Sequence, residues 1–236
     1  MTLVYHGRLP PGALVNHRAE GLWLHAEPGA FADADAPGRI FAWQAKAGEG
    51  VAVAVGPNKT GTLTAPGRAA LRFESGEQGG LVLPGALADT ARCSFGLIWH
   101  PAAADAETLL TLHPGDGGYL YLAAAGGTIR VERKGGGLDL RAAQPDGPVL
   151  VICGISGGLV RLAVNDAPPV MASAAMPPAP ADLFIACRGQ RAGLRGKLGA
   201  FALTDVFVWP GHDCLAAPGD PARAAALDQW RETRAL

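Results

Sequence analysis

The segment HPGDGGYLYL, residues 113–122, contains the side chains best suited to hold a ligand. Tyr119 and Tyr121 are two residues apart, so in a strand both rings lie on the same face. Asp116 precedes them in a glycine-rich turn. Aromatic rings cover the C–H faces of a sugar while neighbouring polar groups bind its hydroxyls, so the segment predicts a carbohydrate site. The alternative is that both tyrosines belong to the core and have satisfied hydroxyls.

Other candidate ligand-binding residues lie at the ends of neighbouring apolar runs. Trp99 and His100 end the run CSFGLIWH, Asn165 ends LVRLAVN and Arg188 ends DLFIACR. The carboxylate of Asp116 and the carbonyls around it are oxygen ligands of the kind that Ca²⁺ binds, so calcium is the one cofactor that the sequence suggests.

Paired acids for sugar hydrolysis do not occur along a strand-like run. A glycosidase needs two carboxylates about 5–9 Å apart, and acids two apart on one strand meet that requirement. Asp33 and Asp35 have this spacing but lie in a loop rich in Gly, Pro and Ala, and Glu74 and Glu77 flank a turn. The chain is therefore predicted not to be an enzyme, with a glycoside hydrolase as the least favoured alternative.

The turn that contains His212, Asp213 and Cys214 is a second place where chemistry is conceivable. A metal site needs three or four converging ligands, and no Cys-x-x-Cys or His-x-x-x-His motif supports one. We expect Asp213 to cap the turn and Cys214 to be buried. The four cysteines are widely spaced, and three lie inside apolar runs, which favours buried free thiols.

The charge balance excludes two classes of partner. Lys and Arg total 20 and Asp and Glu total 21, without a basic run, so nucleic-acid binding is not expected. No apolar run approaches the about 20 residues that cross a bilayer, so membrane insertion is not expected. We see no secretory signal at the N-terminus, and the protein is expected to be made in the cytoplasm.

The elements that must position these residues are short strands. Apolar runs of four to eight residues recur between about residues 22 and 209, separated by turns such as AAGG, KGGG and SGG. Several alternate with period two, as in TIRVERK, whereas VLVICGIS is apolar on both faces. The pattern predicts an all-β, two-sheet antiparallel sandwich. A short C-terminal helix follows, with Asp220 as N-cap, Pro221 as first residue, and Leu227 and Trp230 facing the sandwich.

The last long strand, residues 201–209, changes phase. Its apolar positions shift from Phe201 and Leu203 to Val206 and Val208, which predicts a β-bulge near Thr204 and Asp205.

The order of these features resembles the concanavalin A-like lectin/glucanase superfamily in its laminin-G-like jelly-roll form. The resemblance lies in the strand containing Trp43, then GLVLP, CSFGLIWHP, the hairpins through LAVND, LFIACR and GKLGAFALTDVFVW. It covers roughly residues 40–235, at the level of strand order and turn placement. Asn165-Asp166 replaces the usual Asn-Gly, and FIACR replaces an Ile-Gly strand. The resemblance implies two sheets, one concave, with ligands on that face or its rim.

These observations combine into one functional expectation. Residues 39–236 form the lectin-like domain, and residues 1–38 are an N-terminal extension or added strands that serve as an assembly arm. The chain is expected to be a non-catalytic carbohydrate-binding adhesion protein. It would be a spike or fibre component of a phage or phage-like particle, homo-oligomeric or bound to other particle proteins, that binds host polysaccharide. A purely structural jelly-roll protein of such a particle is the alternative.

Overall fold

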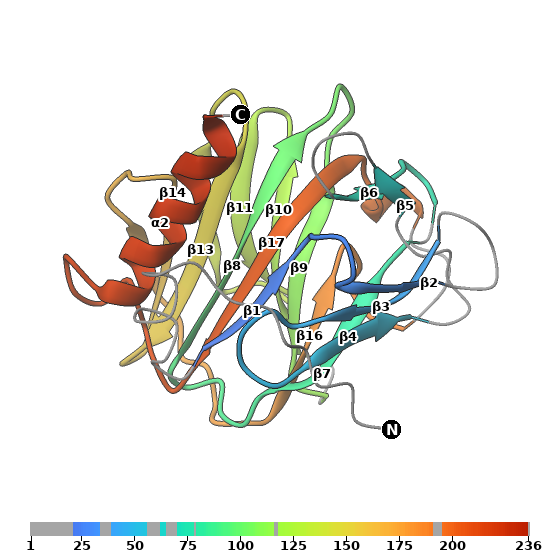
Figure 1. The fold of residues 1–236 in the computed structure, drawn as a ribbon. Coiled ribbons are helices and arrows are strands. Elements are labelled where there is room, and N and C mark those ends of the chain that lie inside the picture. The colour runs from blue at the N-terminus through green and yellow to red at the C-terminus, as the bar shows by residue number, and fades with distance from the viewer. Residues whose placement is uncertain are drawn as a thin grey trace.

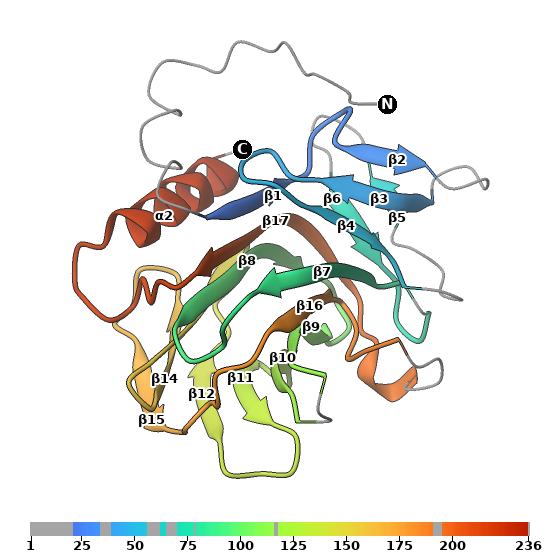
Figure 2. The same cartoon turned by 90° about the horizontal axis from the view of Figure 1, so that it is seen from below.

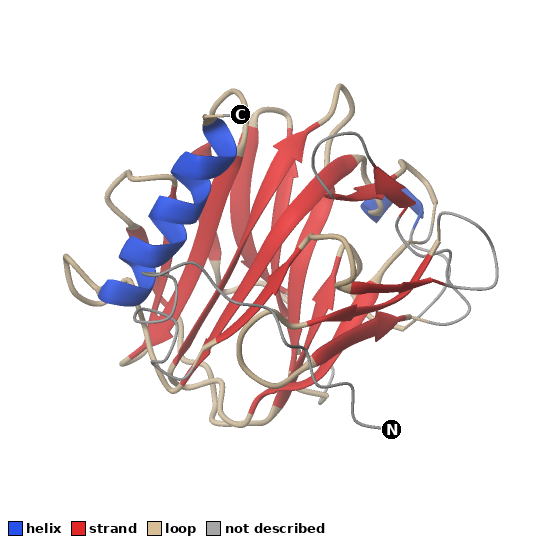
Figure 3. Cartoon of the chain, in the orientation of Figure 1, coloured by secondary structure: helices blue, strands red, loops and turns tan. Residues whose placement is uncertain are grey.

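The computed structural model describes residues 21–33, 39–55, 62–64, 70–77, 79–115, 118–190 and 195–235. Two antiparallel sheets face each other, and one α-helix lies outside them (Figure 1; Figure 3). The predicted two-sheet β-sandwich with a C-terminal helix is confirmed.

Sheet A has eight strands. In spatial order these are β15 (Val170–Ser173), β14 (Leu159–Val164), β13 (Val149–Ser156), β8 (Cys93–Pro101), β17 (Phe201–Pro210), β6 (Ala70–Phe73) and β5 (Thr62–Thr64), and β1 (Leu22–His25) also pairs with β17. Sheet B has nine, in the order β12 (Asp139–Ala143), β11 (Thr128–Arg133), β10 (Leu120–Ala125), β9 (Glu107–His113), β16 (Ala181–Ile185), β7 (Leu81–Leu87), β4 (Val51–Ala54), β3 (Ile40–Gln44) and β2 (Phe31–Asp33). A short 3₁₀ helix, η1 (Arg195–Lys197), precedes β17.

The core between the sheets follows from the period-two alternation of the strands. Leu120 and Leu122 of β10 point inward, as do Ile129 and Val131 of β11. The intervening side chains of both strands therefore lie on the outer face of sheet B. This alternation decides which residues of the hairpin are available to a ligand.

The outer face of sheet A is covered by helix α2 (Pro221–Arg234), as Figure 2 shows from below. Ile152 of β13 and Phe207 of β17 pack there against Trp230 of the helix. This second apolar layer explains why VLVICGIS is apolar on both faces. Asp220 caps the helix by accepting hydrogen bonds from the backbone N–H groups of Ala222 and Arg223, as predicted.

The predicted bulge in β17 is confirmed by a register shift against β8 between Leu203 and Asp205. Because one residue is inserted, Phe201 and Leu203 on one side of the bulge and Val206 and Val208 on the other all face the core between the sheets. Phe207 and Trp209 consequently face the helix.

The N-terminal part of the described chain belongs to both sheets. Strand β1 pairs with β17 along its whole length, from Leu22 opposite Val208 to His25 opposite Asp205. Strand β2 pairs with β3 at the edge of sheet B. Residues 1–20 lie outside the described residues, so the division at residue 38 and the assembly arm stay predictions.

All four cysteines are buried and unpaired, which confirms the prediction of free thiols. Burial raises the pKa of Cys93, Cys187 and Cys214 to about 12 and that of Cys153 well above its ordinary value. Because only the thiolate reacts readily, we expect almost no reaction with Ellman's reagent near pH 8 in the folded protein. In denaturant all four thiols should react. Rapid labelling of the folded protein, or fewer than four thiols after unfolding, would contradict this prediction.

Candidate functional site

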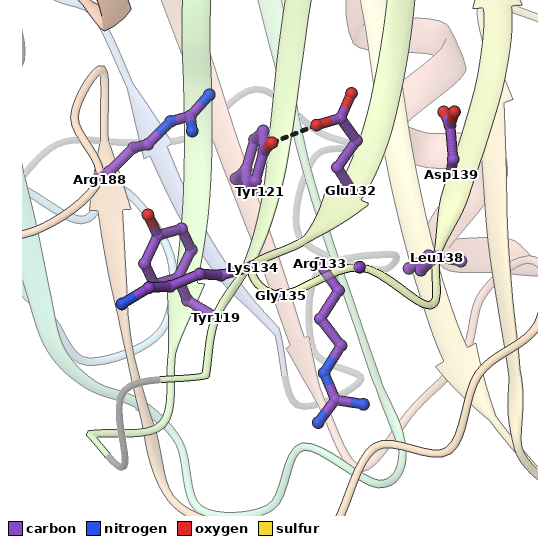
Figure 4. A pocket seen from close by; sticks show the side chains of 10 residues that line it. Tyr119, Tyr121, Glu132, Arg133, Lys134, Gly135, Leu138, Asp139 and Arg188 are labelled. Carbon is purple, nitrogen blue, oxygen red and sulfur yellow. Dashed lines mark hydrogen bonds between the residues drawn. The ribbon is translucent and has the colours of Figure 1, made fainter.

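The open part of the outer face of sheet B lies over strands β10, β11 and β12. At the other end of this face, over β16, β7 and β4, a small apolar cluster buries Val82, Phe184 and Leu198. Over β10–β12 a pocket of about 480 Å³ opens instead. Its lining residues are Tyr119, Tyr121, Glu132, Arg133, Lys134, Gly135, Gly136, Leu138, Asp139 and Arg188 (Figure 4).

The β10–β11 hairpin places Tyr121 beside Glu132. Gly126 and Gly127 have φ values of 58° and 70°, the left-handed conformation that a tight two-residue turn requires. Counting outward from this turn pairs Tyr121 with Glu132. The Tyr121 hydroxyl donates a hydrogen bond to the Glu132 carboxylate. Partial burial, followed by this hydrogen bond, raises the pKa of Tyr121, so the phenol remains a proton donor.

Strand β12 adds a second carboxylate to the same face. The β11–β12 turn runs through three consecutive glycines, residues 135–137, all with positive φ, and it sets Asp139 opposite Glu132. Arg141 binds Asp139 through two parallel hydrogen bonds and lowers the pKa of that carboxyl. Arg130 forms the corresponding ion pair with Glu132, 3.3 Å between Nη1 and Oε1.

Two cations lie over the tyrosine rings. The Arg188 guanidinium carbon is 3.7 Å from the ring centroid of Tyr121, and its Nε donates to the hydroxyl of Thr108 at 3.0 Å. The Lys134 ammonium is 5.2 Å from the ring centroid of Tyr119. Each ring holds its cation through the negative potential of the π face.

The remaining side chains complete an aromatic row along the pocket. His113 of β9 stacks on Tyr119 at 5.5 Å, and Tyr119 lies 5.9 Å from Tyr121. The chain enters this region after β16 through Ala186, whose φ of 59° is unusual for a residue other than glycine. Arg188 follows two residues later and reaches across to β10.

The structure brings together three of the predicted ligand-binding residues, Tyr119, Tyr121 and Arg188. Both tyrosines are half-buried and lie on the outer face, so the alternative that they are core residues does not hold. Asp116 lies outside the described residues. The calcium expectation that rests on it stays a prediction, and among the described residues no group of three His, Cys, Asp or Glu side chains is arranged to hold a metal.

Three other candidates lie elsewhere, and their assignment to this site is corrected. Trp99 is only 1% exposed and packs edge-on against Phe201 between the sheets, because it alternates inward on central strand β8. His100, next in β8, points to the outer face of sheet A. Asn165 follows β14 at the open end of the β13–β14 hairpin, where its side-chain oxygen accepts a hydrogen bond from the N–H of Leu150.

The turn after β17 has the structural role that the sequence predicts. Asp213 binds Arg161 and Ser156, whereas His212 binds Asp220 and Cys214 is buried. These contacts hold the turn, and its three side chains do not converge on one point.

Four of the lining residues were missed because they are polar side chains without a motif: Glu132, Arg133, Lys134 and Asp139. A signal for two of them was present. Tyr121 and Glu132 are equidistant from the Gly126-Gly127 turn, and period two places Lys134 on the same face as Glu132. The position of Arg188 above the sheet depends on the bend after β16, which no sequence pattern indicates.

Comparisons with solved structures place the fold among β-sandwiches of carbohydrate-active enzymes. No protein-family model matches the sequence, and a search of curated proteins finds no match. Among the described residues no helix has the length and apolarity to cross a membrane.

Three solved structures illustrate the likeness. The chain resembles Trypanosoma rangeli sialidase in complex with a difluoro-KDN ligand, with a TM-score of 0.55 and 13% identity over 88% of this chain and 32% of that one. It resembles an arabinofuranosidase complexed with arabinofuranosyl-α-1,2-xylobiose, with a TM-score of 0.59 and 6% identity. That match covers 83% of this chain and 51% of the arabinofuranosidase. It also resembles domain 4 of AbnA, a GH43 arabinanase from Geobacillus stearothermophilus, in complex with arabinotriose, with a TM-score of 0.53 and 15% identity. That match covers 70% of this chain and 81% of the AbnA domain.

The prediction that the chain is not an enzyme is contradicted by these neighbours, which are sialidases and glycoside hydrolases or parts of them. That prediction relied on acids two apart along one strand. The spacing criterion was incomplete, since carboxylates on adjacent strands, such as Glu132 and Asp139, can be paired without any spacing that the sequence displays. The chain spans about a third of the sialidase and half of the arabinofuranosidase, and the likeness shows a β-sandwich compatible with the concanavalin-like jelly roll.

Proposed function

We propose that this protein binds carbohydrate in the pocket over β10–β12. The observation that supports the proposal is the pocket itself, which lies on the open sheet face and combines two tyrosines with side chains of both charges. Sugar hydroxyls both donate and accept hydrogen bonds, so a site that offers carboxylates, phenols and cations together suits them. Domain 4 of AbnA, which is similar in structure, was solved in complex with arabinotriose, and this agrees with a sugar ligand on this fold.

The polar groups of this pocket offer a ligand more contacts than the open faces of its aromatic rings do. Arg188 occupies one face of Tyr121, so this residue meets a ligand with its edge and its hydroxyl. Glu132 and Asp139 each form an ion pair with a neighbouring arginine, and their carboxylates keep lone pairs for sugar hydroxyls. Hydrogen bonding to a carbohydrate therefore accounts for the residues present.

Replacement of Tyr119 or Tyr121 with alanine should weaken glycan binding about tenfold or more, because each substitution removes a ring that lines the pocket and supports a cation. A glycan array would identify ligands, and titration calorimetry would then compare the variants. Phe41→Ala is the matched control, since Phe41 is an exposed aromatic residue on β3 of the same sheet and outside the pocket. Silence across a broad array, or equal loss in the control, would overturn the proposal.

The same ligands should be assayed for released reducing ends, because the fold occurs in glycoside hydrolases. Hydrolysis that Glu132→Gln abolishes would extend the proposal from binding to catalysis. Attachment to a host polysaccharide as part of a phage-like particle, oligomer formation and synthesis in the cytoplasm stay predictions from the sequence.

A further inference from the structure

The charges of the pocket do not balance locally. Its two carboxylates, Glu132 and Asp139, are neutralised by Arg130 and Arg141, which stand outside the lining. Lys134 and Arg188 line the pocket, and among the described residues neither forms an ion pair with a carboxylate. The pocket therefore presents two cations whose charge no carboxylate of the described residues cancels.

The way these cations are held suits an anionic ligand. Each lies over a tyrosine ring, which positions it without neutralising it. Arg188 is fixed further by the hydrogen bond from its Nε to the hydroxyl of Thr108. A guanidinium carries five N–H donors, so this bond leaves further donors for an oxyanion. Lys134 is exposed, so its ammonium is accessible from solvent.

Arg133 does not add to this pair. Its guanidinium donates to the carbonyl of Ala175 and turns away from the tyrosines (Figure 4). The positive charge that faces the tyrosines is thus carried by Lys134, over the ring of Tyr119, and by Arg188, over the ring of Tyr121.

We infer that the pocket selects acidic glycans, and that Lys134 and Arg188 bind a carboxylate or sulfate group of the sugar. This inference rests on the proposed function and names its ligand class. Carboxylate and sulfate share the chemistry that a guanidinium and an ammonium recognise, namely a compact group of negatively charged oxygens. The neighbouring tyrosine hydroxyls and carboxylates then bind the uncharged part of the sugar.

The test compares each acidic sugar with its neutral counterpart by titration calorimetry. One arm uses trigalacturonic acid against its methyl ester, and a second uses a sulfated carrageenan tetrasaccharide against its desulfated form. Arabinotriose serves as a neutral reference. We expect an acidic ligand to bind about tenfold more tightly than its neutral form at low salt, and this preference to shrink about threefold when salt is raised to about 0.3 M.

Variants assign the preference to the two cations. Lys134→Gln should weaken acidic-glycan binding about three- to tenfold and should weaken binding of the neutral form clearly less. Arg188→Lys, which keeps the charge but not the fork of donors, should weaken it less than Arg188→Gln. Arg231→Gln on α2 removes the same charge from the opposite side of the molecule and should have no effect.

The outcomes separate this inference from the proposed function. Preference in the first arm identifies a carboxylate ligand and preference in the second a sulfate ligand. If neutral and acidic forms bind equally well, and alanine at Tyr121 weakens both, the acidic preference is overturned while carbohydrate binding stands. If no ligand binds, the proposed function fails and this inference with it.

Discussion

Replacement of Asp213 with alanine is expected to lower the free energy of unfolding by about 3–5 kcal/mol, because it leaves a buried charge without its partner. The Asp213 side chain is 1% exposed, and that of Arg161 is 12% exposed. One oxygen of Asp213 accepts hydrogen bonds from Arg161 and Ser156, each at 2.6 Å, and the other accepts one from the backbone N–H of Leu215. Gly154 provides room for this carboxylate, since a Cβ there would lie 2.1 Å from it.

Chemical denaturation followed by tryptophan fluorescence would measure the loss. Asp228→Ala is the control, because it breaks an exposed pair with Arg231 and should change stability by less than about 0.5 kcal/mol. The double variant Asp213→Ala, Arg161→Met removes both charges and should recover part of the lost stability. A loss below about 1 kcal/mol for Asp213→Ala would show that the network contributes little.

Replacement of Trp230 with alanine should lower the free energy of unfolding by about 3–5 kcal/mol, because it removes the largest side chain that α2 contributes to the cluster against sheet A. Trp230 is 3% exposed and donates a hydrogen bond to the carbonyl of Pro148 at 2.8 Å. Its loss leaves Ile152 and Phe207 facing a cavity.

Trp230→Phe tests which interaction matters. It keeps most of the apolar contact and loses the hydrogen bond, so it should lower the free energy of unfolding by only about 1–2 kcal/mol. Thermal melting of the three proteins would rank them. Equal melting temperatures for Trp230→Ala and the unsubstituted protein would show that the helix is not needed for the stability of the sandwich.

The fold was predictable because its signals are local. The double apolar pattern of residues 149–156 indicates a strand covered on both sides, and the structure supplies α2 as the second cover. The phase change at Thr204-Asp205 was readable for the same reason, since a strand alternates strictly unless a residue is inserted.

The site was only partly predictable, because it is assembled by pairing between strands. Tyr119 and Tyr121 carried a signal in their own spacing, and both line the pocket. Trp99 carried an equally plausible signal as an aromatic residue at a strand end, yet it belongs to the other sheet and points into the core. Composition along the chain does not tell which of two sheets a strand joins, or which of its faces is covered.

The absence of an acid pair along one strand gave the wrong prediction about enzyme activity for a related reason. Glu132 and Asp139 are seven residues apart and become neighbours only when the three-glycine turn folds β12 against β11. Their proximity follows from the register of the hairpin and not from their spacing along the chain.

The two faces of sheet B have different roles, and this difference affects how the ligand preference of the pocket can change. Inward residues of β10–β12 build the core, whereas Tyr121, Glu132 and Asp139 of the same strands line the pocket together with residues of the adjoining turns and Arg188. Neighbouring positions on a strand point to opposite faces, one toward the core and one toward the pocket. New pocket residues can therefore be chosen at every second strand position without repacking the interior. The hairpins of β10–β12 are thus a compact scaffold for combinatorial libraries directed at other sugars.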